Sequence, residues 1–236
     1  MSPPELSLAR QLAHDARSPV SALVVLAESL GQQLESVVDG RQAYQLKLIH
    51  HAAVSLDHLL SDLVELSGSQ GELPLSSRKA FSLDEVLSRV QDLLLPLAEL
   101  HNVRIEYRSA EPDRRVGFPA ALSQALLALA SIPLREGGRA TVEILADPAP
   151  EDPSRMAFTV SSANWGVDPE TVATVESVAL GREPRNRACL SNLGLELAFR
   201  LVDRMGSSLS FERGADAAGR FTFTLSLPSA GTPPPG

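Results

Sequence analysis

The sequence is poor in the features that mark several common protein classes. Its 236 residues include a single cysteine, Cys189, which rules out an internal disulfide framework and is typical of a reducing compartment. Lys and Arg total 21 against 29 Asp and Glu, a net charge of -8, so the chain lacks the basic surface that nucleic-acid binding requires. No apolar run is long enough to span a bilayer, and no signal-peptide pattern opens the chain. We therefore expect a cytoplasmic protein that binds neither membrane nor nucleic acid.

Two stretches near the N-terminus repeat apolar residues at helical spacing, one over about residues 6–34 and one over about 48–66. The short polar connector 38–41 predicts that they pack as an antiparallel hairpin, which we assign to residues 1–70. Such a hairpin cannot cover its own apolar seam, so a second copy would complete a four-helix bundle and the chain is predicted to be a homodimer. The stripe on the first helix consists of Leu12, Ala16, Leu23, Ala27, Leu30 and Leu34.

The pattern changes after residues 71–80, which are rich in Ser, Gly and Pro and are predicted to be a linker. Over 81–229, helical and alternating patterns follow one another, which indicates an α+β sandwich of helices beside a mostly antiparallel sheet. Ser82 with Glu85 three residues later is a helix-start pattern. We expect helices at 82–100, 119–131 and 192–205, strands at 103–108, 141–146, 156–161, 209–212 and 220–227, and a disordered tail at 230–236.

His14 lies on the first predicted helix, on the side opposite the apolar stripe. A neutral imidazole nitrogen is a nucleophile towards phosphorus near neutral pH, Asp15 could hold the ring, and Arg17 could offset phosphoryl charge. On periodicity alone, an exposed histidine of an ordinary bundle is the simpler interpretation. The outward face around His14 is small and apolar, a surface that another protein can approach closely, and consists of Ser18, Ser21, Ala22 and Val25.

A resemblance changes that balance. The residues from His14 to Pro19, His-Asp-Ala-Arg-Ser-Pro, resemble the phosphoacceptor box of two-component histidine kinases. Residues 49–66 resemble the second dimerisation helix of that family, 81–87 resemble the start of its ATPase domain, and 193–197 and 219–223 resemble the last third of that domain. The resemblance implies that His14 carries a phosphoryl group, with Asp15, Arg17 and Ser18 beside it. It also implies that 81–229 form an ATPase-type sandwich.

The residues that bind nucleotide in this family are missing. Positions 126–133 read Leu-Leu-Ala-Leu-Ala-Ser-Ile-Pro, so Ala128 and Ile132 offer no magnesium ligand and Pro133 predicts a helix break. The adenine loop reads Ser-Ala-Asn-Trp-Gly from Ser162, which lacks the carboxylate that would receive the adenine amine. Only Gly194 remains of the phosphate-binding glycines. The segment 167–187 is also short for a nucleotide lid. We therefore expect no bound nucleotide and no metal.

The remaining polar candidates receive structural interpretations. Asn164 and Asn192 suit a turn and a helix cap, His101 is expected in a loop, and Trp165 is expected to pack where the nucleotide loop would lie. The histidines of the second helix do not share one face, so a metal site is not favoured over a solvated helix face. These are His50, His51 and His58.

The leading hypothesis is a dimeric histidine phosphotransferase of a phosphorelay. By the resemblance, a receiver-domain aspartate of a response regulator would donate a phosphoryl group to His14, which would pass it to another receiver. The receiver would supply the magnesium, and the ATPase-like part would serve as a second docking surface. Three alternatives stay open: an ATP-dependent histidine kinase with an altered site, a non-catalytic pseudokinase scaffold, and a receiver phosphatase that uses Ser18.

Overall fold

The computed structural model describes residues 78–111, 113–136, 140–183, 192–214 and 218–230, together with a few helical positions between 20 and 49. Contacts divide the chain into two units, Met1–Glu72 and Leu73–Gly236, and each is considered by itself. Among the described residues, no helix is long and apolar enough to cross a bilayer. Of the predicted C-terminal tail at 230–236, only Ala230 is described, and its N–H donates to the Arg114 carbonyl. Most of the predicted helical hairpin lies outside the described residues as well.

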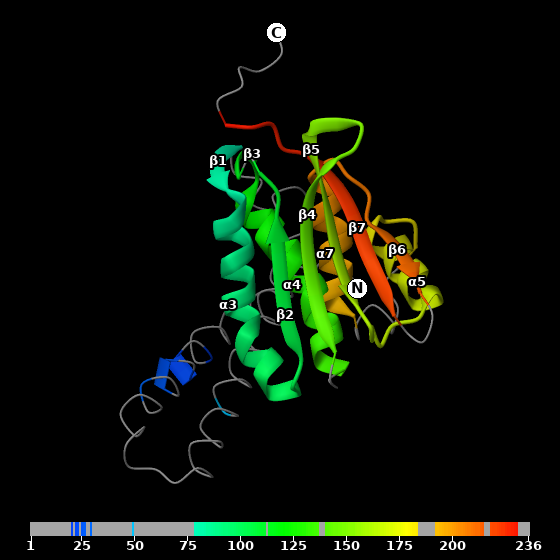
Figure 1. The fold of residues 1–236 in the computed structure, drawn as a ribbon. Helices are drawn as coiled ribbons and strands as arrows, with labels where there is room; N and C mark the ends of the chain where they lie inside the picture. Colours follow the sequence, from blue (N-terminus) through cyan, green and yellow to red (C-terminus); the bar gives the residue numbers. More distant parts are fainter. Residues whose placement is uncertain are drawn as a thin grey trace. The chain divides into compact units, whose positions relative to one another are not determined.

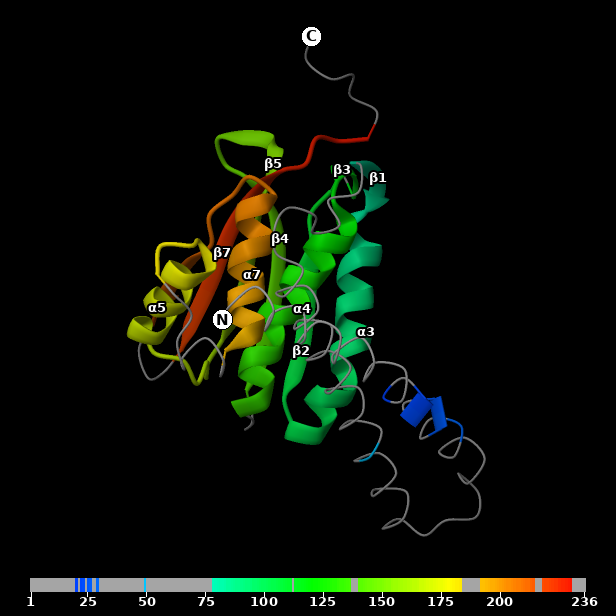
Figure 2. The ribbon, with the colours of Figure 1, turned by 180° about the vertical axis from the view of Figure 1, so that it is seen from behind.

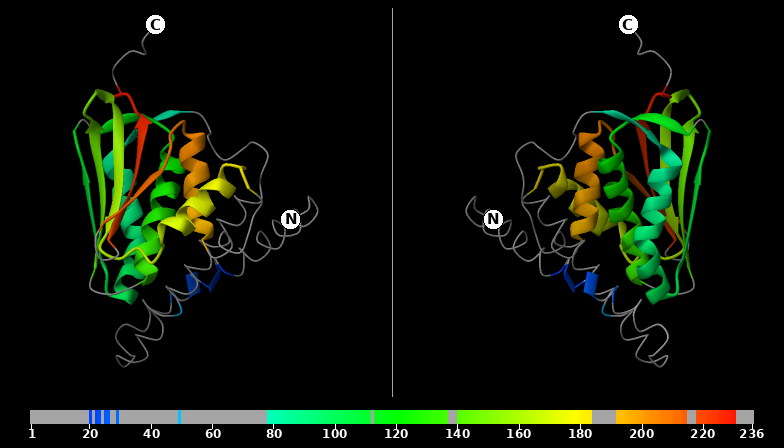
Figure 3. Two further views of the ribbon diagram at one scale, coloured as in Figure 1. Left: turned by 90° about the vertical axis from the view of Figure 1, so that its right-hand side faces the viewer. Right: turned by 90° about the vertical axis from the view of Figure 1, so that its left-hand side faces the viewer.

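The second unit is a two-layer sandwich. Its sheet has five strands in the order β2 (Arg104–Ser109), β4 (Thr141–Ala149), β5 (Asp152–Ser162), β7 (Gly219–Ser226) and β6 (Ser210–Arg213). β2 pairs with β4 in parallel, and the other three pairs are antiparallel. The helices α3 (Leu83–His101), α4 (Pro119–Glu136) and α7 (Leu193–Arg204) lie on one face, as Figures 1 and 3 show. This arrangement confirms the predicted α+β sandwich of the second unit.

Two smaller elements complete the unit. The strands β1 (Lys79–Ser82) and β3 (Arg114–Gly117) form a separate antiparallel ribbon. The helix α5 (Pro169–Ala179) packs beside α7, as the view from behind in Figure 2 shows. Asp168 caps α5, and its carboxylate accepts the backbone N–H of Thr171 at 2.8 Å. This hydrogen bond is the main cause that lowers the pKa of Asp168.

The core follows from the period-two pattern of the strands. Alternate residues of β7 are buried, and Phe223 stacks on Phe158 of β5 with ring centroids 5.1 Å apart. The helices supply the opposing layer, because α4 and α7 bury leucines and alanines along most of their length. Burial of this apolar face is the main driving force for the sandwich. The inward side chains of the sheet include Val142, Ile144, Met156, Phe158, Val160, Phe221, Phe223 and Leu225.

The start of α3 is fixed by two caps. The hydroxyl of Ser82 accepts the N–H of Glu85 at 3.0 Å, as the sequence pattern predicts. Asp113 adds a second cap, since its carboxylate accepts the N–H of Asp84 at 2.7 Å. Asn102 caps the C-terminal end of the helix: its φ of 56° is left-handed, and its backbone N–H closes the last turn. His101 is therefore the last residue of a helix, and the expectation of a loop at His101 was wrong.

The structure also differs from the sequence-based expectations in length and in number of elements. α4 continues through Pro133 to Glu136, because packing of its buried last turns outweighs the hydrogen bond that proline removes. β1 begins at Lys79, so the last two residues expected in the linker pair with β3 instead. β1, β3 and α5 were not predicted. The strands are too short to show alternation, whereas α5 carries a readable pattern of capping Asp168, Pro169 and buried valines.

The cap at Ser82 gives a first test. Replacement S82A removes the acceptor of the Glu85 N–H, and we expect a loss of about 1 kcal/mol in the free energy of unfolding. The matched control is S88A, inside the same helix, which should cost less than about 0.5 kcal/mol. Urea denaturation followed by far-UV circular dichroism measures both. Equal losses in the two variants would show that Ser82 does not act as a cap.

Candidate functional site

The described helical positions of the first unit separate buried from exposed side chains. Val20 is 5% exposed, whereas Leu23 is 50% and Val25 is 62% exposed. Ala22 and Leu26 are exposed as well, and so is Ile49 further along the chain. Large apolar side chains that are half exposed or more on a short helical segment mark surfaces suited to further protein contacts.

These residues lie on different sides of the helix. At about 100° per residue, Leu23 and Val25 point about 160° apart. Val20 points about 60° to one side of Leu23, and Leu26 about 60° to the other. The buried side chain of Val20 therefore lies about 140° from the side of Val25. The segment thus has two exposed apolar faces that point in different directions.

Most of the predicted phosphoacceptor site lies outside the described residues. This applies to His14, Asp15, Arg17, Ser18 and Ser21. It also applies to the histidines of the second predicted helix and to Cys189. Ala22 and Val25 are described, and both are exposed.

Three segments that match the nucleotide-binding parts of histidine kinases lie at one end of the second unit. Met205, which directly follows α7, lies beside Phe118 and Leu122 at the start of α4. The two packed helices therefore run antiparallel, and α7 begins near the end of α4. The loop after β5 reaches the same place, because Gly166 packs against the side chain of Glu136, the last residue of α4. The fold thus brings together the three segments that the resemblance assigns to nucleotide binding, and we call this end of the second unit the nucleotide-like corner.

The α4 part of this corner offers little polar chemistry. Ala128 is buried, Ile132 is half-buried, and Pro133 is buried. The hydroxyl of Ser131 donates to the carbonyl oxygen of Ala128 in its own helix at 2.9 Å. Between Ala128 and Pro133, α4 therefore presents no amide or carboxylate that could ligate a metal ion.

The loop after β5 is folded on itself. The hydroxyl of Ser162 accepts the backbone N–H of Asn164 at 3.3 Å, which agrees with the turn expected there. Trp165 is 1% exposed, and its indole N–H donates to the carbonyl oxygen of Gly219 on β7. Its ring packs edge-on against Phe221, with centroids 4.9 Å apart. Trp165 thus fills the core beneath this loop.

Two acidic residues in this corner were missed by the sequence reasoning. Gly166 has a φ of +63°, and a Cβ there would lie 2.0 Å from the side chain of Glu136, so the loop requires glycine to let that side chain approach. Glu196 is fully buried on α7 and pairs with Arg200 at 2.9 Å. The spacing of four residues between Glu196 and Arg200 was the available sequence signal. Asn192 occupies the N-cap position of α7 without a side-chain capping bond.

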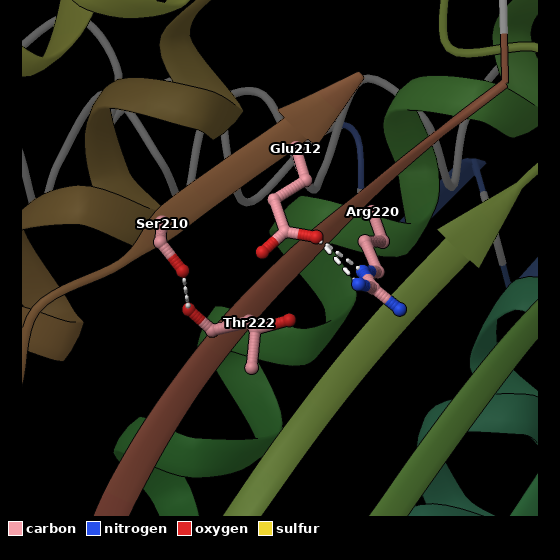
Figure 4. Close-up of polar contacts among 4 residues, drawn as sticks. All are labelled: Ser210, Glu212, Arg220 and Thr222. Atoms are coloured by element: carbon pink, nitrogen blue, oxygen red, sulfur yellow. Dashed lines mark hydrogen bonds and ion pairs between the residues drawn. The ribbon is translucent and has the colours of Figure 1, made fainter. Parts of the chain in front are cut away.

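A cavity of about 730 Å³ opens at the ends of β4, β5, β6 and β7, on the sheet side away from the helices. Four of its polar side chains pair with one another: the hydroxyl of Ser161 donates to Glu143 at 3.3 Å, and the guanidinium of Arg220 donates twice to Glu212, at 2.8 and 2.5 Å. Figure 4 shows the Arg220–Glu212 pair beside the bond from Ser210 to the Thr222 carbonyl. The contacts of Ser210 and Glu212 hold the edge strand β6 on β7. We assign the cavity no ligand.

Comparison with known proteins agrees with the fold. No protein-family model matches the chain. The Sensory/regulatory protein RpfC of Xanthomonas campestris pv. campestris is 26% identical over 225 residues, which is 92% of this chain and 30% of that protein. The Aerobic respiration control sensor protein ArcB of Escherichia coli is 21% identical over 228 residues, 92% of this chain and 28% of ArcB. The chain spans about three tenths of the length of these curated relatives.

Solved structures give the same result. Full-length ShkA, solved in complex with AMPPNP, has a TM-score of 0.63 at 21% identity, covering 98% of this chain and 47% of ShkA. The histidine kinase AdeS of Acinetobacter baumannii has a TM-score of 0.55 at 16% identity, covering 90% and 97%. The chain is similar to two-component sensor histidine kinases. At these identities the structural likeness concerns the fold alone.

The tryptophan under the β5 loop provides a test of this site. W165A removes a fully buried indole and its hydrogen bond, and we expect a loss of roughly 3–5 kcal/mol in the free energy of unfolding. W165F keeps an aromatic ring against Phe221 and should lose less than half as much. Far-UV circular dichroism in urea measures the loss, since Trp165 is the sole tryptophan and fluorescence is removed with it. A W165A loss under about 1 kcal/mol would contradict this packing role.

Proposed function

We propose that the chain is a histidine phosphotransferase of a two-component phosphorelay, with His14 as the carrier. In the forward step an imidazole nitrogen of His14 attacks the phosphorus of a receiver acyl phosphate. A P–N bond forms as the P–O bond to the aspartate breaks, the carboxylate leaves, and the imidazole gives up its N–H proton. The reverse chemistry delivers the group to the aspartate of a second receiver. The magnesium ion would belong to the receiver.

The observation that supports this over an ATP-dependent kinase is the chemistry of the nucleotide-like corner. Ala128 and Ile132 replace polar ligands with apolar side chains, and Ser131 is engaged with its own helix. Glu136 adds an exposed carboxylate to the region where a kinase would hold a triphosphate, and like charges repel. The His-Asp-Ala-Arg-Ser-Pro segment keeps its phosphoacceptor pattern beside these losses.

The exposed faces of the first unit suit the two contacts that the mechanism needs. The side of Leu23 is the predicted dimer seam. By the helical spacing of the sequence, Val25 is expected on the same side as His14, so the side of Val25 and Ala22 is the proposed receiver surface, to which Ser21 also contributes by sequence. Both described surfaces are apolar and exposed, and the recognition of a receiver would depend on shape and apolar contact more than on charge.

Label transfer tests the carrier role. Radiolabelled phospho-receivers are mixed with the wild-type chain and, separately, with H14Q, which keeps a polar side chain without the nucleophilic nitrogen. We expect label on the wild-type chain and none on H14Q, followed by chase to an unlabelled second receiver. A regulatory scaffold would give no label on either chain and yet keep its effect in H14Q. If no receiver of the source organism labels the wild-type chain, the carrier hypothesis fails.

Nucleotide titration separates the kinase alternative, which the likeness to AMPPNP-bound ShkA keeps under test. We expect no heat of binding when Mg-ATP is titrated into the chain up to millimolar concentration, and no label on His14 from radiolabelled ATP. The apolar side chains in place of polar ligands and the carboxylate of Glu136 are the physical reason. Micromolar ATP affinity together with autophosphorylation would replace the phosphotransferase proposal by the kinase one.

A pair of substitutions tests the two faces separately. V25D places a carboxylate on the proposed receiver surface and should slow transfer by about ten- to a hundredfold, because docking would bury an unpaired charge, while the dimer remains. L23D on the opposite side should dissociate the dimer. Light scattering gives the oligomeric state, and label transfer gives the rate. Loss of the dimer in V25D, or its survival in L23D, would contradict the assignment of faces.

A further inference from the structure

The last described residues, 227–230, leave the five-stranded sheet and join the two-stranded ribbon; we call them the C-terminal strap (Figure 1). The N–H of Leu227 donates to Ser154 of β5 at 2.8 Å. The N–H of Val116 on β3 then donates to Pro228 at 2.9 Å, and the N–H of Ala230 donates back to the Arg114 carbonyl at 2.9 Å. Since β3 also pairs with β1, the strap and β1 occupy its two edges.

A buried arginine lies beneath this crossing. Arg115 on β3 has no exposed surface, and its Nη1 donates to the carbonyl oxygens of Pro153 at 3.1 Å and Leu227 at 3.2 Å. The two acceptors belong to the β4–β5 hairpin and to the strap, so one side chain ties three segments together. Burial lowers the pKa of Arg115, and the nearby Asp113 opposes this. A desolvated guanidinium is costly unless hydrogen bonds satisfy it. Removal of the Arg115 side chain would take the donor from the carbonyl oxygens of Pro153 and Leu227, so we expect it to loosen the hairpin and the strap.

β1 depends on β3 for its place. It has four residues and pairs in register from Lys79–Gly117 to Ser82–Arg114. A two-stranded ribbon of this length is marginal by itself in water. β1 is also the first strand after the predicted linker, and Arg78 immediately before it donates to the Ser226 carbonyl at 2.9 Å. Both ends of the described unit therefore meet at one small ribbon.

We propose that the C-terminal strap and Arg115 act together as a latch that holds β1 against the rest of the second unit. With the latch closed, the linker ends at β1. With the latch open, Lys79, Ala80 and Phe81 join the linker and lengthen it by roughly 10 Å of extended chain, while Ser82 remains the cap of α3. A partner that binds the C-terminal end would in this way change the tether between the two units. The proposal concerns the second unit alone and stands apart from the chemistry at His14.

Hydrogen exchange on the full chain, read by mass spectrometry, tests the latch. R115M removes the two hydrogen bonds while keeping an unbranched side chain of similar length. R114M is the matched control, because Arg114 is the preceding residue of the same strand and its side chain is exposed. We expect the amides of β1 and of the strap to lose protection together by at least about tenfold in R115M. The β6–β7 hairpin should stay unchanged, and R114M should match the wild type.

A chain that ends at Leu227 provides the second variant, since it lacks the bonds made by Pro228 and Ala230 while Arg115 remains. The latch predicts the same loss of protection at β1. Unchanged exchange at β1 in a folded R115M or in the shortened chain overturns the proposal, even if the strap itself exchanges faster. If R115M does not fold, the shortened chain decides. If both fail to fold while R114M folds, the strap is required for the whole unit, and the local latch is also overturned.

Discussion

The second unit depends on one constraint, which is that the inner face of its sheet must be covered. Strands β4, β5 and β7 turn valine, isoleucine, methionine and phenylalanine side chains to the same side, and α4 and α7 bury that surface from water. Polar features take their positions from this packing. The antiparallel course of α4 and α7, fixed by their shared apolar contact, brings the end of α4, the start of α7 and the loop after β5 to one corner. The fold therefore matches that of histidine kinase ATPase domains, while α4 presents no polar ligand at that corner between Ala128 and Pro133.

The described residues of this corner pack without a polar ligand on α4. Ile132 and Ala128 extend the apolar surface of α4, Ser131 satisfies its hydroxyl within the helix, and Glu196 is balanced by Arg200 on the next turn. The Ser131 hydroxyl and the Glu196 carboxylate thus each have a partner inside the protein.

How far the sequence predicted the structure depended on the length of each pattern. Long alternations gave β4, β5 and β7, and the Ser82–Glu85 spacing gave the start of α3. Short strands such as Arg114–Gly117 carry too few residues for a pattern, and the course of α4 beyond Pro133 depended on packing that no local rule contains. In the candidate site, the described residues quoted from the family resemblance, such as Ala128 and Ile132, could be placed from the sequence on one helix. Glu136 could not be predicted, because its contact with Gly166 joins segments about thirty residues apart in the chain. The predicted homodimer and His14 itself remain predictions.

The mixed strand order also bears on how the unit assembles. β4 and β5 are joined by a short turn and pair along most of their length, so their contacts are local and close a small loop. β2 pairs in parallel with β4 only after the chain has passed through β3 and the whole of α4, a non-local closure that carries a larger entropic cost. We expect the hairpin to be the nucleus of folding and the β2 edge to dock late. Substitutions in the hairpin would then slow folding, and substitutions at the edge would mainly speed unfolding.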